Sequence, residues 1–85
     1  MKVKVLFFAG LREQLGTAAE EIELPSDVTT VAGLRNFLSN KNQSWKSALA
    51  ETKPIRMAVN QDMAQPTARI KAGDEVAFFP PVTGG

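Results

Sequence analysis

The residues best suited to chemistry are the last six of the sequence, Pro80–Gly85. Gly84 and Gly85 have no side chains, so they can enter a channel that a bulkier residue would block, and they present an unshielded carboxylate. That carboxylate is a poor acyl donor until a partner enzyme converts it, with ATP, to an acyl-adenylate that a sulfur or nitrogen nucleophile can attack. The chain would then supply reach and orientation, while the partner supplies catalysis. We therefore expect covalent chemistry at Gly85.

The residues before the two glycines have the composition of a projecting arm. Pro80 and Pro81 favour an extended, polyproline-like path, and Val82 and Thr83 continue it. Six residues reach at most about 20 Å when extended. The terminal glycines alone are a weak signal, because chance produces such a pair in about 0.5% of chains and chain ends are often small and frayed. We expect a folded domain over residues 1–79 and a flexible tail over residues 80–85.

Side-chain chemistry elsewhere is limited by missing residue types. The sequence has no Cys, His or Tyr, which argues against a disulfide framework, a serine-hydrolase triad, a zinc enzyme or any other metal site. Ten basic and nine acidic residues leave a net charge of +1, so we expect no binding to nucleic acid or to an anionic membrane. Without a secretory signal or a long apolar span, we expect a soluble cytoplasmic protein.

The first half of the sequence shows both the two-residue period of strands and the 3.6-residue period of helices. Residues 2–8 alternate between polar and apolar at first and then become apolar throughout, which predicts a strand whose far end is buried on both faces. Residues 20–24 alternate again and predict a second strand, antiparallel to the first. A short helical turn closed by Gly16 separates them. A helical stripe then follows, capped by Thr29 or Thr30, and it consists of Val31, Leu34, Phe37 and Leu38. Ser44 can cap a second short helix in which Trp45 is a core anchor rather than a ligand platform.

After Pro54 the period returns to two residues. A strand is predicted over 57–60, a turn over 60–62, a weak element over 67–71 and a final strand over 75–79, which the two prolines end. The fold class is therefore α+β, a mixed sheet packed against one main helix plus short helices. The first and last strands are the most apolar, so we expect them side by side and parallel at the centre of the sheet.

The C-terminal segment resembles that of a known family. Residues 76–85 read VAFFPPVTGG and follow Gly73-Asp74-Glu75, as in the small subunit of molybdopterin synthase. The opening VKVLFFA over residues 3–9, the following Leu11-Arg12-Glu13, and Val59-Asn60 also match that family. The resemblance runs from end to end and implies a β-grasp, ubiquitin-like fold.

The resemblance also implies a function. Gly85 would be adenylated by an ATP-dependent, ubiquitin-activating-like enzyme and converted to a thiocarboxylate, with a sulfurtransferase as the sulfur source. The tail would then enter the large subunit of the synthase and give its sulfur to cyclic pyranopterin monophosphate, forming the dithiolene of molybdopterin. The family forms a heterotetramer with two small subunits, and its catalytic side chains belong to the large subunit. This chain would be a sulfur donor without a permanently bound cofactor.

A partner interface can be partly assigned. Alternation along the last strand puts Phe79 on the face opposite Phe78, and an uncovered face would leave an apolar patch that calls for a partner. By analogy with the family, Phe79 anchors the interface with Met63 near it, although core packing would explain both side chains. Arg12 could contact the activating enzyme or lie on a solvated helix face.

Two other classes of function fit the same residues. The chain could carry sulfur for another pathway, such as thiazole or cysteine synthesis, although thiazole carriers look shorter and lack a helical insert like that at 44–49. It could instead be a ubiquitin-like modifier that Gly85 attaches to lysines of other proteins, or a plain binding module. Attachment to lysines distinguishes a modifier from a carrier.

Overall fold

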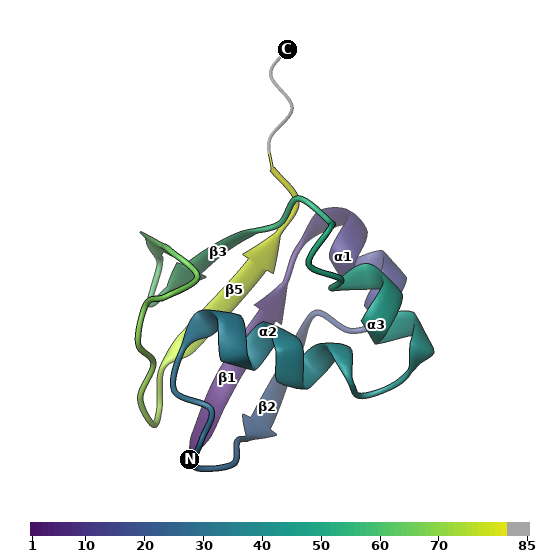
Figure 1. Ribbon diagram of the computed structural model, residues 1–85. Coiled ribbons are helices and arrows are strands. Elements are labelled where there is room, and N and C mark those ends of the chain that lie inside the picture. The colour runs from purple at the N-terminus through teal and green to yellow at the C-terminus, as the bar shows by residue number, and fades with distance from the viewer. Residues whose placement is uncertain (82–85) are drawn as a thin grey trace.

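The computed structural model describes residues 1–81. Its described part contains five strands and three helices (Figure 1). In chain order, the elements are β1 (Lys2–Phe7), α1 (Ala9–Leu15), β2 (Ala19–Glu23), α2 (Val31–Ser39), α3 (Gln43–Ala48), β3 (Arg56–Val59), β4 (Asp62–Ala64) and β5 (Glu75–Phe79). The α+β class expected from the sequence is confirmed.

The five strands form one mixed sheet with the order β2-β1-β5-β3-β4. β1 pairs antiparallel with β2 and parallel with β5, and β3 pairs antiparallel with both β5 and β4. Both predicted pairings are therefore present, with the first and last strands adjacent at the centre. This topology is that of the β-grasp fold, and it puts the end of β5 at the opposite end of the sheet from the N-terminus (Figure 1).

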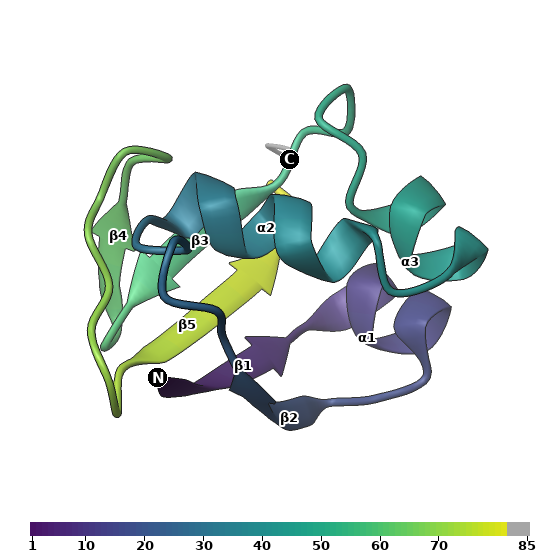
Figure 2. The ribbon, with the colours of Figure 1, turned by 60° about the horizontal axis from the view of Figure 1, so that its bottom comes forward.

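Helix α2 packs across one face of the sheet (Figure 2). Thr30 caps it as predicted, because its Oγ1 accepts a hydrogen bond of 3.1 Å from the Gly33 N–H. Its buried side chains, Val31, Leu34 and Leu38, join those of β1 and β5 in a single core. Phe37 is 37% exposed, so the buried stripe is narrower than the sequence suggested.

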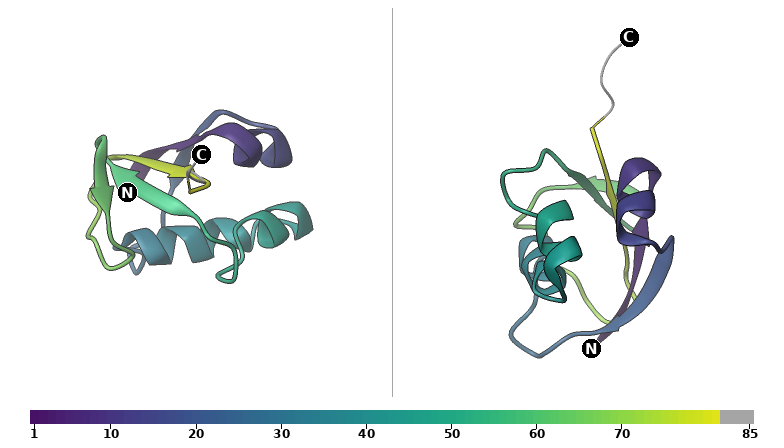
Figure 3. Two further views of the ribbon diagram at one scale, coloured as in Figure 1. Left: turned by 90° about the horizontal axis from the view of Figure 1, so that it is seen from above. Right: turned by 90° about the vertical axis from the view of Figure 1, so that its right-hand side faces the viewer.

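Helix α3 continues the same layer, and α1 lies beyond the end of β1 (Figure 3). Asn42 rather than Ser44 caps α3, because Ser44 already lies inside the helix and the Asn42 side chain accepts a 3.0 Å bond from the Trp45 N–H. Trp45 is buried and meets the Phe7 ring edge-on, with centroids 5.3 Å apart. This confirms that Trp45 is a core anchor.

The hairpin of β3 and β4 differs from the sequence prediction. Asn60 and Gln61 form its two-residue turn with φ values of 50° and 72°, as the predicted turn required. β4 then follows at once, whereas the sequence pattern suggested a weak element only at 67–71. That later segment makes just an isolated bridge between Arg69 and Thr30 among the described residues. β4 escaped prediction because it has three residues and faces largely outward.

Candidate functional site

The candidate site is the place where the chain leaves β5. Val76 and Phe78 of this strand are fully buried, and neighbouring strands pair with both of its edges. The chain therefore leaves the sheet after Phe79 in a fixed position, and Pro80 and Pro81 follow half-buried. The remaining predicted site residues, Val82, Thr83, Gly84 and Gly85, lie outside the described residues.

A set of hydrogen bonds at the opposite end of β5, which we call the clasp, fixes the register of the strand. The Asp74 Oδ2 accepts a hydrogen bond of 2.8 Å from the Lys71 N–H, and its Oδ1 accepts one of 3.1 Å from the Asn60 side chain. Asn60 Oδ1 in turn accepts a bond of 3.0 Å from the Glu75 N–H. The start of β5 is thus tied to the turn between β3 and β4.

The electrostatics of this clasp depend on the ionised form of Asp74. Burial alone would raise the pKa of Asp74. The hydrogen bonds from Lys71 and Asn60, together with the nearby Lys71 ammonium group, outweigh burial and lower that pKa below its ordinary value. Asp74 is therefore a charged structural group rather than a general acid.

The sheet face opposite α2 carries an apolar patch that ends at the tail. Strand pairing places Phe79 and Met63 on this same face, on either side of β3. Alternation and strand register assign six residues to this patch, which we call the open-face patch: Leu6, Phe8, Ala58, Met63, Ala77 and Phe79. Met63 is 61% exposed and so lies outside the core, while Phe79 is half-buried.

Phe8 is a member of this patch that the sequence analysis missed. The apolar end of the first predicted strand implied burial on both faces, but Phe8 is 45% exposed and lies just after β1 in an extended conformation. Its N–H donates a 3.2 Å bond to the Phe78 carbonyl, so it remains aligned with β5. The alternation of buried Val3, Val5 and Phe7 was the signal that could have assigned Phe8 to the outer face.

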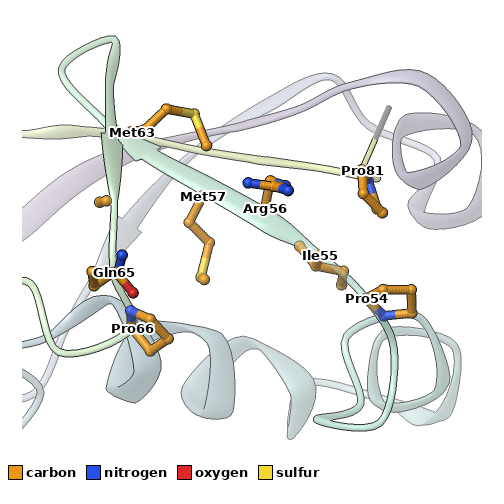
Figure 4. A pocket seen from close by; sticks show the side chains of 9 residues that line it. Pro54, Ile55, Arg56, Met57, Met63, Gln65, Pro66 and Pro81 are labelled. Atoms are coloured by element: carbon orange, nitrogen blue, oxygen red, sulfur yellow. The ribbon is translucent and has the colours of Figure 1, made fainter. Parts of the chain in front are cut away.

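Two hollows flank Pro81. One, of about 460 Å³, lies beside β3 and includes Arg56 and Met63 in its lining (Figure 4). The other, of about 380 Å³, lies between α1 and the loop after α3, with Leu11 among its lining residues. Arg12 is exposed on α1, the helix that borders the second hollow. The predicted interface residues therefore come from elements that surround the exit of the tail.

Arg35 holds one wall of these hollows in place, which the sequence did not reveal. From α2 its guanidinium donates hydrogen bonds to the carbonyls of Leu49 and Lys53, each at 2.9 Å, and also to that of Ala50. Burial lowers the pKa of Arg35, and the nearby Glu51 carboxylate partly offsets this. One side chain thereby fixes the loop that leads into β3.

Few other groups in residues 1–81 are arranged for chemistry. Residues 1–81 contain no group of three or more His, Cys, Asp or Glu side chains that could hold a metal ion. No helix in this part of the chain is long and apolar enough to cross a membrane. The arrangement can position a tail and offer an apolar surface around its base.

Comparison with known proteins agrees with this description. The sequence matches the ThiS family over residues 5–85. It is 46% identical to the molybdopterin synthase sulfur carrier subunit of Escherichia coli K12 over 98% of this chain and 99% of that protein. SAMP1 from Haloferax volcanii superposes with a TM-score of 0.82 at 27% identity over the full length of both chains. A Helicobacter pylori complex of subunits 1 and 2 of molybdopterin-converting factor contains a chain with a TM-score of 0.65 at 25% identity, again over both full lengths.

Proposed function

The chain belongs to the ThiS family, and from this premise we propose that it is the sulfur carrier subunit of a molybdopterin synthase, with sulfur carried on Gly85. The observation that carries the proposal is that the family match extends to residue 85, so it includes both terminal glycines. The fold supports it, because paired neighbours on both edges of β5 fix the position from which the tail starts.

The proposed chemistry takes place on the terminal carboxylate in three steps. An activating enzyme transfers AMP from ATP to Gly85 and releases pyrophosphate. Sulfur at the oxidation level of hydrosulfide, delivered by way of a sulfurtransferase, then attacks the acyl carbon, so that a C–S bond replaces the C–O bond to AMP, AMP leaves and a thiocarboxylate remains. In the large subunit, the sulfur passes to cyclic pyranopterin monophosphate, and water restores the carboxylate. The chain needs no catalytic side chain of its own in this scheme.

The folded body contributes position and contact area. The open-face patch would pack against the large subunit, with Phe79 and Met63 among its contacts and the tail inserted beside them. Arg12, exposed on α1, would meet the activating enzyme. Because every partner must reach the same carboxylate, the activating enzyme and the large subunit would bind in turn. We propose two such chains in the complete synthase, as a heterotetramer.

Intact-mass measurement tests the sulfur step. The protein is incubated with the activating enzyme, ATP and a sulfur donor, and we expect a mass gain equal to the exchange of one oxygen for sulfur at Gly85. A variant extended by one residue beyond Gly85 is the matched control, and it should fold normally without gaining sulfur. An unmodified wild-type terminus, or sulfuration of the extended variant, would contradict the proposal.

A protein modifier is the second candidate function, because one of the structures that the chain resembles is a small archaeal modifier protein. In that case the activated Gly85 would be attacked by a lysine amine of another protein and form an isopeptide bond. Denaturing gels of cells that express a tagged chain would then show higher-mass conjugates. A carrier would give only the free chain and its thiocarboxylate.

A further inference from the structure

β4 covers the outer edge of β3 over only part of its length. Met57–Val59 pair with β4, and the last of these pairs joins Met57 to Ala64. Arg56 pairs with Phe79 on the β5 side, but within residues 1–81 it has no strand partner on the side of β4. The Asn60 N–H bonds to the Glu75 carbonyl, so in this register the backbone groups of Ala58 and Arg56 face β5, while those of Met57 and Val59 face β4. The open sheet edge, to which another strand can add, is therefore made by the N–H and carbonyl of Ile55, directly before β3.

The chain after β4 cannot close this opening. Pro66 has no N–H to donate to a sheet. Its carbonyl accepts a 2.9 Å bond from the Ala32 N–H at the start of α2, and the Gln65 carbonyl accepts a 2.9 Å bond from the Ala68 N–H. The segment is therefore held away from β3 and leaves the edge open.

The space between this edge and the diverging segment is the 460 Å³ hollow (Figure 4). Its lining is mixed: Ile55, Met57 and Met63 contribute apolar side chains, while Arg56 and Gln65 contribute polar groups. Arg56 is exposed beside it and forms no salt bridge with any residue of the described part of the chain. The hollow therefore suits apolar side chains accompanied by an anionic group.

The hollow also lies within reach of the proposed reaction. Pro81 is one of its lining residues, and Gly85 lies only four positions further along the chain. Four residues span at most about 14 Å. An enzyme that acts on Gly85 must therefore place its surface close to Pro81, so this step of the inference depends on the proposed function.

We propose that an extended segment of the large subunit adds to the sheet at the Ile55 edge. Its backbone would pair with β3, its apolar side chains would fill the hollow, and a carboxylate would pair with Arg56. The neighbouring open-face patch makes this contact continuous with the surface that Phe79 and Met63 offer. The groove beside β3 is thus a docking site for an acidic, apolar strand.

Binding measurements with the purified large subunit test this site. We expect Arg56→Glu to weaken binding by about tenfold or more at low salt, because it replaces an ion pair with two like charges. The loss should shrink as salt is added. Arg69→Glu is the matched control, since it reverses an exposed cation just before the turn that starts β5, and it should change affinity by less than about twofold. Hydrogen exchange should show new protection of the Ile55 amide in the complex, whereas the Arg56 amide, which faces β5, should change little.

The outcomes separate this inference from the proposed function. If Arg56→Glu binds as tightly as the wild type, or if the Ile55 amide gains no protection, the docking site is wrong while the function stands. If the wild type neither binds the large subunit nor gains sulfur, both are wrong. Protection of the Ile55 amide on concentrating the chain alone would identify a second copy as the occupant and overturn the inference.

Discussion

Asp74 is the one buried polar or charged side chain among residues 1–81. It does not react, yet it joins the turn before β5 to the turn after β3 through Lys71 and Asn60. Its charged form accepts these bonds, so the clasp requires the carboxylate. The residue that sets the register of the site therefore lies at the opposite end of the strand from the tail.

The pKa of Asp74 makes the stability of the fold depend on pH. The folded pKa lies below the unfolded value of about 3.9, so the ionised side chain stabilises the fold above that value. This stabilisation is lost as the pH falls through the folded pKa. We expect Asp74→Asn to lower the free energy of unfolding by about 1–3 kcal/mol at neutral pH and to reduce its dependence on acid pH. Urea unfolding between neutral and acid pH measures both, and an unchanged acid dependence in the variant would contradict the assignment.

Residue-level prediction from the sequence was limited by alternatives only a few positions apart. Thr29 and Thr30 both suited the start of α2, and Thr30 is the cap; Ser44 was predicted for α3, but Asn42 caps it. Only the backbone shows which residue precedes the first helical one. Phe8 was assigned to the core because an apolar run does not show where a strand ends. The residue types showed which kinds of side chain cap the helices, but they did not show which position holds each cap.

At the scale of elements, the loop between α3 and β3 depends on α2. Three carbonyls of that loop accept hydrogen bonds from Arg35, and the loop has no regular structure of its own. The start of β3 and both hollows at the base of the tail border this loop. Arg35 is thus a positioning residue for the surface around Pro81.

Removal of that side chain should cost stability. We expect Arg35→Met to lower the free energy of unfolding by about 2–4 kcal/mol, because it leaves the partly buried carbonyls of Leu49 and Ala50, and the exposed carbonyl of Lys53, without their donor. Arg12→Met is the control, since Arg12 is exposed on α1, and it should change stability by less than about 0.5 kcal/mol. Denaturant unfolding compares the two variants. Equal effects would show that Arg35 does not hold the loop.

Elements with a strong period were predictable, and those without one were not. β1, β2, β5 and α2 each repeat their apolar residues at the spacing of their structure. β4 has three residues, and its position is set by pairing with β3 rather than by its own pattern. The open edge at Ile55 depends on β3, β4 and the start of α2 together, so no single stretch of sequence contained the signal for it.

At the scale of the whole molecule, the core is complete before the tail begins. The fully buried side chains of the described part lie between Val3 and Phe78. We therefore expect a chain that ends at Pro81 to unfold at the same temperature as the full chain, while losing the ability to gain sulfur. Thermal unfolding followed by circular dichroism checks the first point. A midpoint lower by more than about 4 °C would mean that residues 82–85 contribute to the fold.

The proposed whole-molecule function could be formulated from the sequence because the chemistry it requires is concentrated at one end. Gly84-Gly85, the preceding prolines and the absence of Cys and His pointed to the terminus without any knowledge of the fold. The proposed partner surface could not be found in the same way. Its residues come from four strands and from α1, which meet only after folding.

The parallel pairing of β1 with β5 has a consequence for synthesis. The first strand to leave the ribosome lacks one neighbour until nearly the whole chain has been translated, so the centre of the sheet cannot form on a partial nascent chain. Val5 and Phe7 are fully buried in the folded protein, but until β5 has been translated they lack this neighbouring strand. A product that terminates before Glu75 therefore lacks both the central strand β5 and the proposed reactive end.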